Sequence, residues 1–240
     1  MQDVIGRLTA QSNARSTDVR LKAMDEANRL IRAGTLHREV SGEVNNHVHT
    51  TYSFSPYEPA GAAWAAWQAG LGIVGSVDHE SVGAATELLS ACRALGIAGT
   101  VGFEVRCSFL DTPFANRKIN NPDSKGIAYL CVHGIKSASL AKADGFLAPL
   151  RRVRDQRNRA QVERLNEILF PLGIDRIDFD LDVAPVSRSA EGGSITERHI
   201  LYACSEKLKQ AHREKSDMVR FLKRGLSVDL TWKQESLLLE

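Results

Sequence analysis

Between residues 44 and 103, short apolar runs alternate with stretches of helical periodicity. This pattern predicts strands at Val44–His49, Gly72–Val77 and Ile97–Phe103, separated by helices at Pro59–Ala69 and Gly83–Leu95. Repeated β-α units of this kind build a parallel sheet or barrel. The fold class that we expect is therefore α/β.

Further elements are predicted on either side of this region: a helix at Thr17–Ile31, a long polar loop at Cys107–Gly126, a strand at Ile127–Val132, and helices at Phe146–Leu169 and Ile195–Leu208. The first of these helices precedes the β-α pattern. We therefore expect residues 1–40 to form an N-terminal helical extension and residues 41–240 to form the main domain.

The balance of charge argues against nucleic acid or a membrane surface as a partner. The 240 residues include 31 basic and 29 acidic side chains, for a formal net charge of +2. The chain shows no signal peptide and no apolar run approaching the ~20 residues of a membrane span, which favours a cytoplasmic location. The four cysteines form no C-x-x-C pair, which indicates reduced thiols. Nothing in the sequence indicates an oligomeric state.

Potential metal ligands lie at the end of every predicted strand. They are His47 and His49 on the first strand, Asp78 and His79 on the second, Glu104 on the third and His133 on the fourth. Because the carboxyl ends of parallel strands gather on one face of a sheet or barrel, we expect these side chains to converge.

His47 and His49 are two residues apart, so both imidazoles point to the same side of the first strand. Such a pair alone is as often two half-exposed histidines as a metal site. The neighbouring strand ends favour the metal site. Nitrogen and carboxylate donors together suit Zn, Mn or Fe, and their number predicts two or three divalent ions, with Glu104 suited to bridge two of them. Such a cluster can activate a water as hydroxide.

Gly70, Gly72 and Gly75 match the dinucleotide-binding pattern G-x-G-x-x-G, but their context differs from that of the fingerprint. The fingerprint follows a strand and opens a helix, whereas these glycines close the helix of Trp64 and Trp67 and lead into a strand. We interpret Gly70 as a helix C-cap and the two tryptophans as core packing.

Five arginines crowd the long predicted helix: Arg151, Arg152, Arg154, Arg157 and Arg159. They predict with equal weight a solvated helix face or a phosphate contact, for which we nominate Arg157. His199 follows a Gly-rich loop at the start of a predicted helix, a setting that favours a position facing the site.

At these residues the sequence resembles the PHP family, named for polymerase and histidinol phosphatase domains. The motifs read NHVHTTYSFSP, SVDHES and VGFEV, and the match continues through CVHGI, RRVRDQRNRAQVERLN and ITERHILYACSEKL. The resemblance implies a distorted (β/α)7 barrel holding two or three metal ions. The implied metal ligands are His47, His49, Asp78, Glu104, His133 and His199. It also implies that His79 lies near the substrate, where His79 and His199 would act as catalytic residues.

The sequence departs from this family at two points. Val77 replaces the threonine that usually precedes Asp-His, and the late Asp-x-His pair of the family is absent. In the family that pair arrives on the last barrel strand. We therefore expect the chain to correspond to the N-terminal portion of a longer member, with a barrel that lacks its C-terminal strands.

The leading functional hypothesis is hydrolysis of a small phosphorylated metabolite through a metal-activated hydroxide. An amidohydrolase-like enzyme that attacks a carbonyl carbon would use similar ligands, and only the arginines favour phosphorus. A third hypothesis is a non-catalytic PHP module, which the missing Asp-x-His pair favours. Substrate specificity is expected to lie in loops such as Asp111–Lys125.

Overall fold

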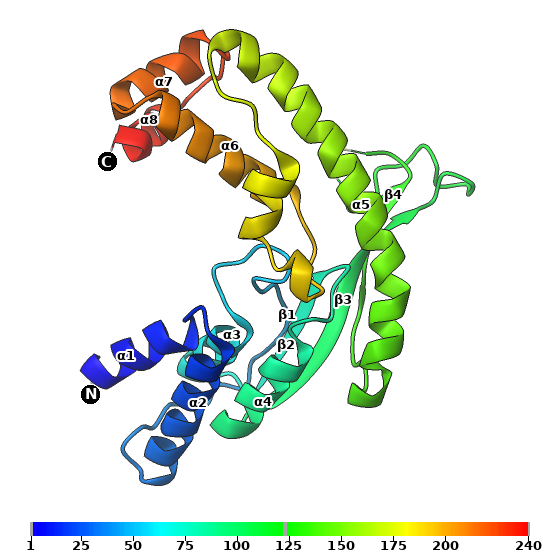
Figure 1. Cartoon of the computed structure of the whole chain (residues 1–240). Coiled ribbons are helices and arrows are strands. Elements are labelled where there is room, and N and C mark those ends of the chain that lie inside the picture. Colours follow the sequence, from blue (N-terminus) through cyan, green and yellow to red (C-terminus); the bar gives the residue numbers. More distant parts are fainter. Residues whose placement is uncertain (1, 122–123, 240) are drawn as a thin grey trace. The chain divides into compact units, whose positions relative to one another are not determined.

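A computed structural model describes residues 2–121 and 124–239 of the chain (Figure 1). The chain divides into two compact units. The first comprises the residues up to Arg152 together with Ser187–Ser194, and the second comprises Val153–Val186 and the residues from Ile195 onward. The division places the N-terminal helices in the same unit as the sheet, and the boundary expected after residue 40 stays a prediction.

The first unit contains α1 (Gln2–Ser12), α2 (Thr17–Arg32), β1 (Val44–Val48), α3 (Pro59–Gln68), β2 (Ile73–His79), α4 (Ala85–Leu95), β3 (Ala98–Ser108), β4 (Ile127–Val132) and the short helices η1 (Ser137–Ser139) and η5 (Ser189–Glu191). The long helix α5 (Leu140–Leu169) begins in the first unit and ends in the second. The second unit continues with η2 (Phe170–Leu172), η3 (Phe179–Val183), η4 (Ala184–Val186), α6 (Glu197–Ala211), α7 (Lys215–Arg224) and α8 (Trp232–Leu239).

The four strands of the described residues form one sheet in the order β1-β2-β3-β4. The first three strands are parallel, as predicted, and their register sets His79 beside Glu104. The α/β class is confirmed, whereas the four strands do not amount to the complete (β/α)7 barrel that the resemblance implies.

The fourth strand was predicted in the wrong direction. β4 pairs with β3 antiparallel, with Cys131 opposite Glu104. The reason is that β3 does not stop at Phe103 but continues to Ser108, and the described part of the polar segment before β4 forms no helix. A parallel return needs a long crossover, usually a helix, so this chain makes a hairpin instead.

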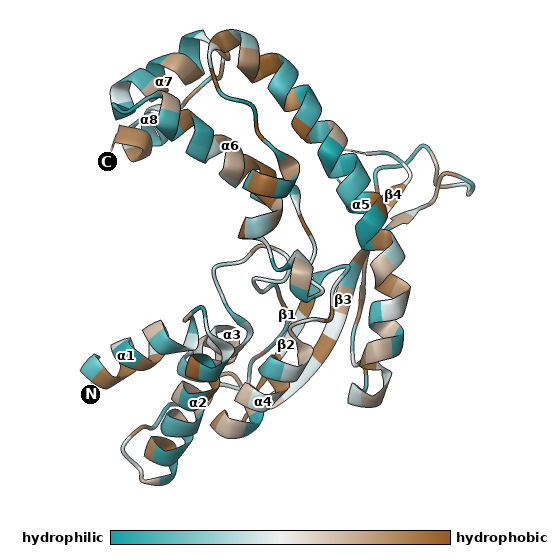
Figure 2. Cartoon of the chain, in the orientation of Figure 1, coloured by the Kyte–Doolittle hydropathy of each residue, from teal (hydrophilic) through white to brown (hydrophobic). Residues whose placement is uncertain are grey.

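Helices cover one face of the parallel strands and enclose the main core of the first unit. Trp64 and Trp67 of α3 are buried, and their rings stack with centroids 5.1 Å apart. Met24 of α2 and Leu8 of α1 belong to the same core as Val74 of β2. The apolar sides of these helices are visible in Figure 2. The N-terminal helices therefore belong to the folded body around the sheet, although α1 was not predicted.

Glycines follow the ends of α3 and α4, and the one after α3, Gly70, was predicted. Gly96 follows α4 with a φ of 68°, and Gly70 follows α3 with a φ of 79°. Left-handed backbone at these points is accessible to glycine without strain. The G-x-G-x-x-G match accordingly joins α3 to β2, which confirms that it lacks the strand–loop–helix context of a dinucleotide site.

The second unit has an apolar core of its own. Val162 and Leu169 of α5 pack with Phe179 of η3 and with Ile200 and Ala203 of α6. Helix α5 begins at Leu140 rather than at the predicted Phe146. Within the described residues, none of the helices is long and apolar enough to cross a bilayer.

Candidate metal centre

Three side chains of the first unit bring one donor atom each to a common point. His47 Nε2 lies 3.3 Å from His49 Nε2. Glu104 Oε2 lies 3.3 Å from His47 Nε2 and 3.5 Å from His49 Nε2. Among residues 2–121 and 124–239, these three side chains form the group whose donor atoms meet closely enough to hold an ion.

The spacing of these donor atoms fits a small divalent cation. An ion bonded to nitrogen and oxygen at about 2.0–2.1 Å in a tetrahedral arrangement separates its ligands by about 3.3–3.4 Å. The three observed separations, 3.3, 3.3 and 3.5 Å, match that triangle. Two imidazole nitrogens and a carboxylate oxygen repel one another at this distance unless they share a proton or a cation. The donor set, two imidazoles and one carboxylate, suits Zn, Mn or Fe.

The sheet positions this triad. His47 lies on β1, His49 is the first residue after β1, and Glu104 lies on β3. The Glu104 side chain is 11% exposed, whereas those of His47 and His49 are 47% and 30% exposed. The charged ligand is thus the most buried of the three, and the two imidazoles open the centre to solvent.

Ser53 connects His49 to Asp78. The Ser53 hydroxyl donates to Asp78 Oδ1 at 2.7 Å, and its oxygen lies 3.2 Å from His49 Nδ1. Because Ser53 gives its single proton to Asp78, it acts as an acceptor towards His49, so we assign the imidazole proton to Nδ1. The lone pair on His49 Nε2 then faces the other two donors, as metal binding requires.

Asp78 holds the turn that follows β1. It is 1% exposed, and its carboxylate also accepts the backbone N–H of Thr50 at 2.6 Å and the Thr50 hydroxyl at 2.7 Å. Burial raises the pKa of Asp78, and the hydrogen bonds from Ser53 and Thr50 oppose this by stabilising the carboxylate. Its predicted role as a direct metal ligand stays a prediction, because these three donors occupy the carboxylate here.

His79 lies against the triad. Its Nδ1 is 3.8 Å from Glu104 Oε1, and its ring lies over that of His49 with centroids 4.8 Å apart. Burial acts to raise the pKa of Glu104, but a hydrogen bond from His49 and the charges of His79, His49 and His47 outweigh burial and lower that pKa when the group shares a proton, whose place a bound cation would take. Glu104 is therefore ionised at neutral pH and supplies the negative charge that a cation site needs.

Cys131 of β4 and His133, which directly follows the last residue of β4, lie at the same edge. The rings of His133 and His47 lie 6.5 Å apart, and Cys131 Sγ lies 3.8 Å from His47 Nδ1 and 3.7 Å from Glu104 Oε2. We expected His133 here because β4 was thought to be parallel. His133 instead lies near His47 because the antiparallel strand β4 ends opposite the middle of β3. Cys131 was missed, although its place two residues before His133 puts both on one strand face.

His199 belongs to the second unit, where it caps a helix. Its Nδ1 accepts the backbone N–H of Thr196 at 3.0 Å, which forms a capping box at the start of α6. His199 is 2% exposed, and burial lowers its pKa to about 4. The ring is therefore neutral at pH 7. Because the triad belongs to the other unit, the predicted roles of His199 as ligand and catalytic residue stay predictions.

The arginine cluster on α5 is largely paired with carboxylates from other segments. Arg157 and Arg154 both contact Glu197, and Arg159 binds the two carboxylate oxygens of Asp180 at 2.6 Å each. These partners lie 21 to 43 residues away in the sequence, so the composition near the arginines did not reveal them. The proposed contact between Arg157 and substrate phosphate stays a prediction.

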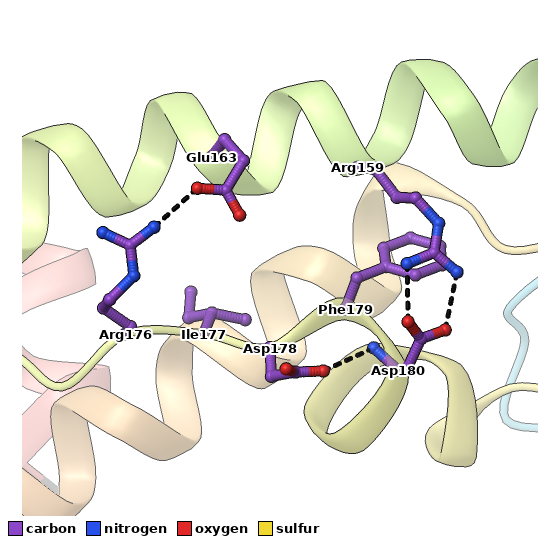
Figure 3. A pocket seen from close by; sticks show the side chains of 7 residues that line it. All are labelled: Arg159, Glu163, Arg176, Ile177, Asp178, Phe179 and Asp180. Atoms are coloured by element: carbon purple, nitrogen blue, oxygen red, sulfur yellow. Dashed lines mark hydrogen bonds and ion pairs between the residues drawn. The ribbon is translucent and has the colours of Figure 1, made fainter.

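The second unit contains a cavity of about 380 Å³ on the α5 surface (Figure 3). Its lining residues are Arg159, Glu163, Arg176, Ile177, Asp178, Phe179 and Asp180. The Arg159 guanidinium lies 4.2 Å from the centre of the Phe179 ring, and Arg176 binds Glu163 at 2.5 Å. Each guanidinium is neutralised by its own carboxylate, and the cavity lining includes none of the predicted metal ligands. We assign it no catalytic role.

Comparison with known proteins yields two solved structures with a similar architecture, while no family model and no curated protein matches. A proposed metal-dependent phosphoesterase from Bifidobacterium adolescentis superposes with a TM-score of 0.55 at 20% identity. An amidohydrolase from Chromobacterium violaceum, solved with bound sulfate and no metal, superposes with a TM-score of 0.50 at 20% identity. The chain shares their fold.

These alignments cover 80% and 75% of this chain but 58% and 54% of the two proteins. The chain thus spans little more than half their length. At 20% identity the likeness is one of fold alone. The chemistry has to be argued from the residues of the metal centre.

Proposed function

We propose that the chain is a metal-dependent hydrolase whose centre is formed by His47, His49 and Glu104. The observation that carries this proposal is the convergence of their three donor atoms at 3.3–3.5 Å, with the carboxylate ionised and one imidazole oriented by Ser53. The fold shared with a proposed metal-dependent phosphoesterase and with an amidohydrolase supports it.

A bound Zn, Mn or Fe ion would lower the pKa of a coordinated water toward about 7 and offset negative charge on the substrate. The triad would hold the first ion. Asp78, His79, His133 and His199 are the further candidates for a cluster of two or three ions, as in the PHP family that the sequence resembles. We also propose that the sheet of this chain corresponds to part of the distorted (β/α)7 barrel of that family.

The neighbouring side chains of the chain would handle protons and orientation. Ser53 and Asp78 keep the His49 lone pair directed at the centre, and the buried carboxylate of Glu104 supplies charge. We assign to His79, which lies beside Glu104, the task of holding or donating a proton at the leaving group. His199 would add to the stabilisation of developing charge, and Arg157 would bind the substrate's phosphate.

Among substrates, we propose a small phosphorylated molecule. The motif resemblance to the PHP family points to phosphate esters. The runner-up is hydrolysis of a carbonyl substrate, which the shared fold of the C. violaceum amidohydrolase favours, since the ligand set alone does not separate carbon from phosphorus electrophiles.

The test begins with metal-stripped protein reloaded separately with Mn²⁺, Zn²⁺ or Fe²⁺. Each form is assayed with p-nitrophenyl phosphate and with a p-nitroanilide. We expect metal-dependent release of p-nitrophenol from the phosphate ester with at least one metal. Cleavage of the anilide alone would favour the runner-up, and no turnover with any metal would favour a non-catalytic module.

The matched variants are His47→Ala/His49→Ala and, as control, His37→Ala, which removes an exposed histidine outside the centre. The double variant should lose metal-dependent turnover by more than about 100-fold, because loss of a side chain that binds the metal costs more than loss of a partner that only orients a ligand, which costs roughly 10–100-fold. The control should retain the activity of the unaltered chain. Full turnover in the double variant would place the centre elsewhere.

A further inference from the structure

A buried network of charges lies beneath the loop that follows the His47–His49 motif. Its members are two arginines and two glutamates, each less than about a fifth exposed at the side chain: Arg20, Glu58, Glu87 and Arg188. They come from α2, from the residue before α3, from α4 and from the Ser187–Ser194 segment, all within the first unit. None of the four is a predicted metal ligand.

Arg20 is the anchor of this network. It is 1% exposed, and its guanidinium binds both carboxylate oxygens of Glu87, with distances of 2.7 and 2.6 Å. Its Nη1 donates to the backbone oxygens of Ala14 and Arg15 at 2.8 and 2.9 Å, and its Nη2 also donates to the Thr17 hydroxyl at 2.8 Å. The turn between α1 and α2 is thereby tied to α4.

Glu58 is the centre of the network. One carboxylate oxygen accepts from Arg188, and the other accepts the Thr51 hydroxyl at 2.9 Å and lies 3.6 Å from Arg20 Nη1. Its backbone N–H donates to Asn13 Oδ1 at 3.1 Å. A single carboxylate thus joins the N-terminal helices, the Ser187–Ser194 segment and the loop.

The Thr51 hydroxyl links this network to the metal centre. Thr51 follows Thr50, which binds Asp78, and stands two residues from His49. Its backbone N–H donates to the carbonyl oxygen of Tyr57 at 2.9 Å, which closes the loop. The carbonyl oxygen of the next residue, Tyr52, accepts from the backbone N–H of Ser194 at 2.8 Å.

Buried ion pairs of this kind add little net stability, because desolvation offsets most of their attraction. They instead fix positions, because a buried carboxylate is stable only where its hydrogen-bond donors can reach it. The position of Glu58 therefore determines where Thr51 and the following residues lie, Ser53 among them. Ser53 in turn orients the His49 imidazole.

We infer that Glu58, together with Arg20 and Arg188, positions the metal-binding loop through the Thr51 hydroxyl, so that the N-terminal helices tune metal affinity from outside the centre. The inference rests on the proposed function in one respect, that His49 binds a metal. It adds that positioning residues for this ligand lie on α2 and on the Ser187–Ser194 segment.

The experiment measures the dissociation constant of Zn²⁺ and of Mn²⁺ by chelator competition on the full chain. Thr51→Val removes the hydroxyl without changing the shape of the side chain, and Thr51→Ser keeps the hydroxyl. We expect Thr51→Val to weaken binding by about tenfold, at the lower end of outer-shell effects, and Thr51→Ser to restore it to within about twofold. Glu58→Gln should weaken binding by a similar factor, and combining it with Thr51→Val should add little further loss.

Arg7→Gln is the matched control, because Arg7 makes an equally short two-pronged contact with Glu26 between α1 and α2 without touching the loop. Its metal affinity should equal that of the unaltered chain. Unchanged affinity in Thr51→Val, or equal losses in Thr51→Val and Thr51→Ser, would overturn the inference. An unaltered chain that binds no metal would instead overturn the proposed function. A loss of melting temperature without a change in affinity would show a merely structural network.

Discussion

The proposed metal centre depends on the tautomer of a single residue, His49. Its Nδ1 faces an oxygen that has already given its proton to a buried carboxylate, so Nε2 is left as the ligand atom. A ligating histidine usually gives its other N–H to such a partner, and that partner sets both ring orientation and basicity. Ser53 is that partner for His49, although nothing in its immediate sequence context distinguishes it from Ser55.

Replacing Ser53 by Ala should therefore weaken metal binding. Without the acceptor at Nδ1, the His49 imidazole loses both its orientation and its preferred tautomer, and we expect the dissociation constant for Zn²⁺ to rise by about tenfold. Chelator competition measures this change, and ¹⁵N spectra of the ring report the tautomer.

Ser55→Ala is the control for this prediction, because the Ser55 hydroxyl serves only the backbone N–H of Tyr57 among the contacts of the described residues. Its affinity should stay unchanged. If Ser53→Ala bound zinc as tightly as the control, the relay from Asp78 to His49 would have no part in the centre.

The ligands on the first strands were predictable because a strand has a fixed side-chain period. His47 and His49 lie at the end of β1 as predicted, and Glu104 lies beside the end of β2 although β3 continues beyond it to Ser108, so their convergence needs no knowledge of loops. The contacts around them were not predictable in the same way. Ser53 reaches Asp78 only through the fold of the loop, and Cys131 reaches Glu104 only through the hairpin.

At the scale of elements, the hairpin of β3 and β4 shapes one side of the centre. Gly102 lies beside the end of β4, and a Cβ there would stand 2.0 Å from the carbonyl oxygen of Val132, the residue before His133. Sequence reasoning placed β4 correctly along the chain but gave it the wrong direction, because the direction of a strand depends on what the preceding loop forms.

Gly102→Ala should consequently destabilise the first unit and displace the end of β4. Since the clash is with backbone, the strands must move apart, and we expect a loss of at least about 2 kcal/mol in the free energy of unfolding, with a melting temperature lower by several degrees. Thermal unfolding followed by circular dichroism checks it.

Gly72→Ala is the counterpart for Gly102→Ala, because a Cβ at Gly72 meets no atom within 4 Å. Its melting temperature should remain within about a degree of that of the unaltered chain. Equal melting temperatures for both variants would mean that β4 does not pack against Gly102 as described.

At the scale of the whole molecule, two compact units share one long helix. The triad and its positioning network belong to the first unit, whereas His199 and the paired arginines belong to the second. The division of the chain after Arg152 escaped sequence reasoning because α5 continues across it without a break in helical periodicity. Leu8 and Met24 of the N-terminal helices enter the core beside the sheet, and the boundary expected after residue 40 stays a prediction.

Metal binding should therefore stabilise the two units unequally. A ligand at 100 times its dissociation constant stabilises the state that binds it by about 2.7 kcal/mol. Hydrogen exchange with and without saturating Zn²⁺ should show increased protection in β1, β2 and β3 and unchanged protection in α7 and α8. Increased protection at the start of α6 would support His199 as a further ligand. Protection gained only in the second unit would contradict a centre on the sheet.

The most direct test of the central claim is a crystal structure of the full chain soaked with Mn²⁺ or Zn²⁺, with anomalous scattering to locate the ion. The account predicts an anomalous peak about 2.0–2.2 Å from His47 Nε2, His49 Nε2 and Glu104 Oε2 together. A chain that hydrolyses its substrate only with metal, but whose anomalous peak lies away from these three atoms, would contradict it.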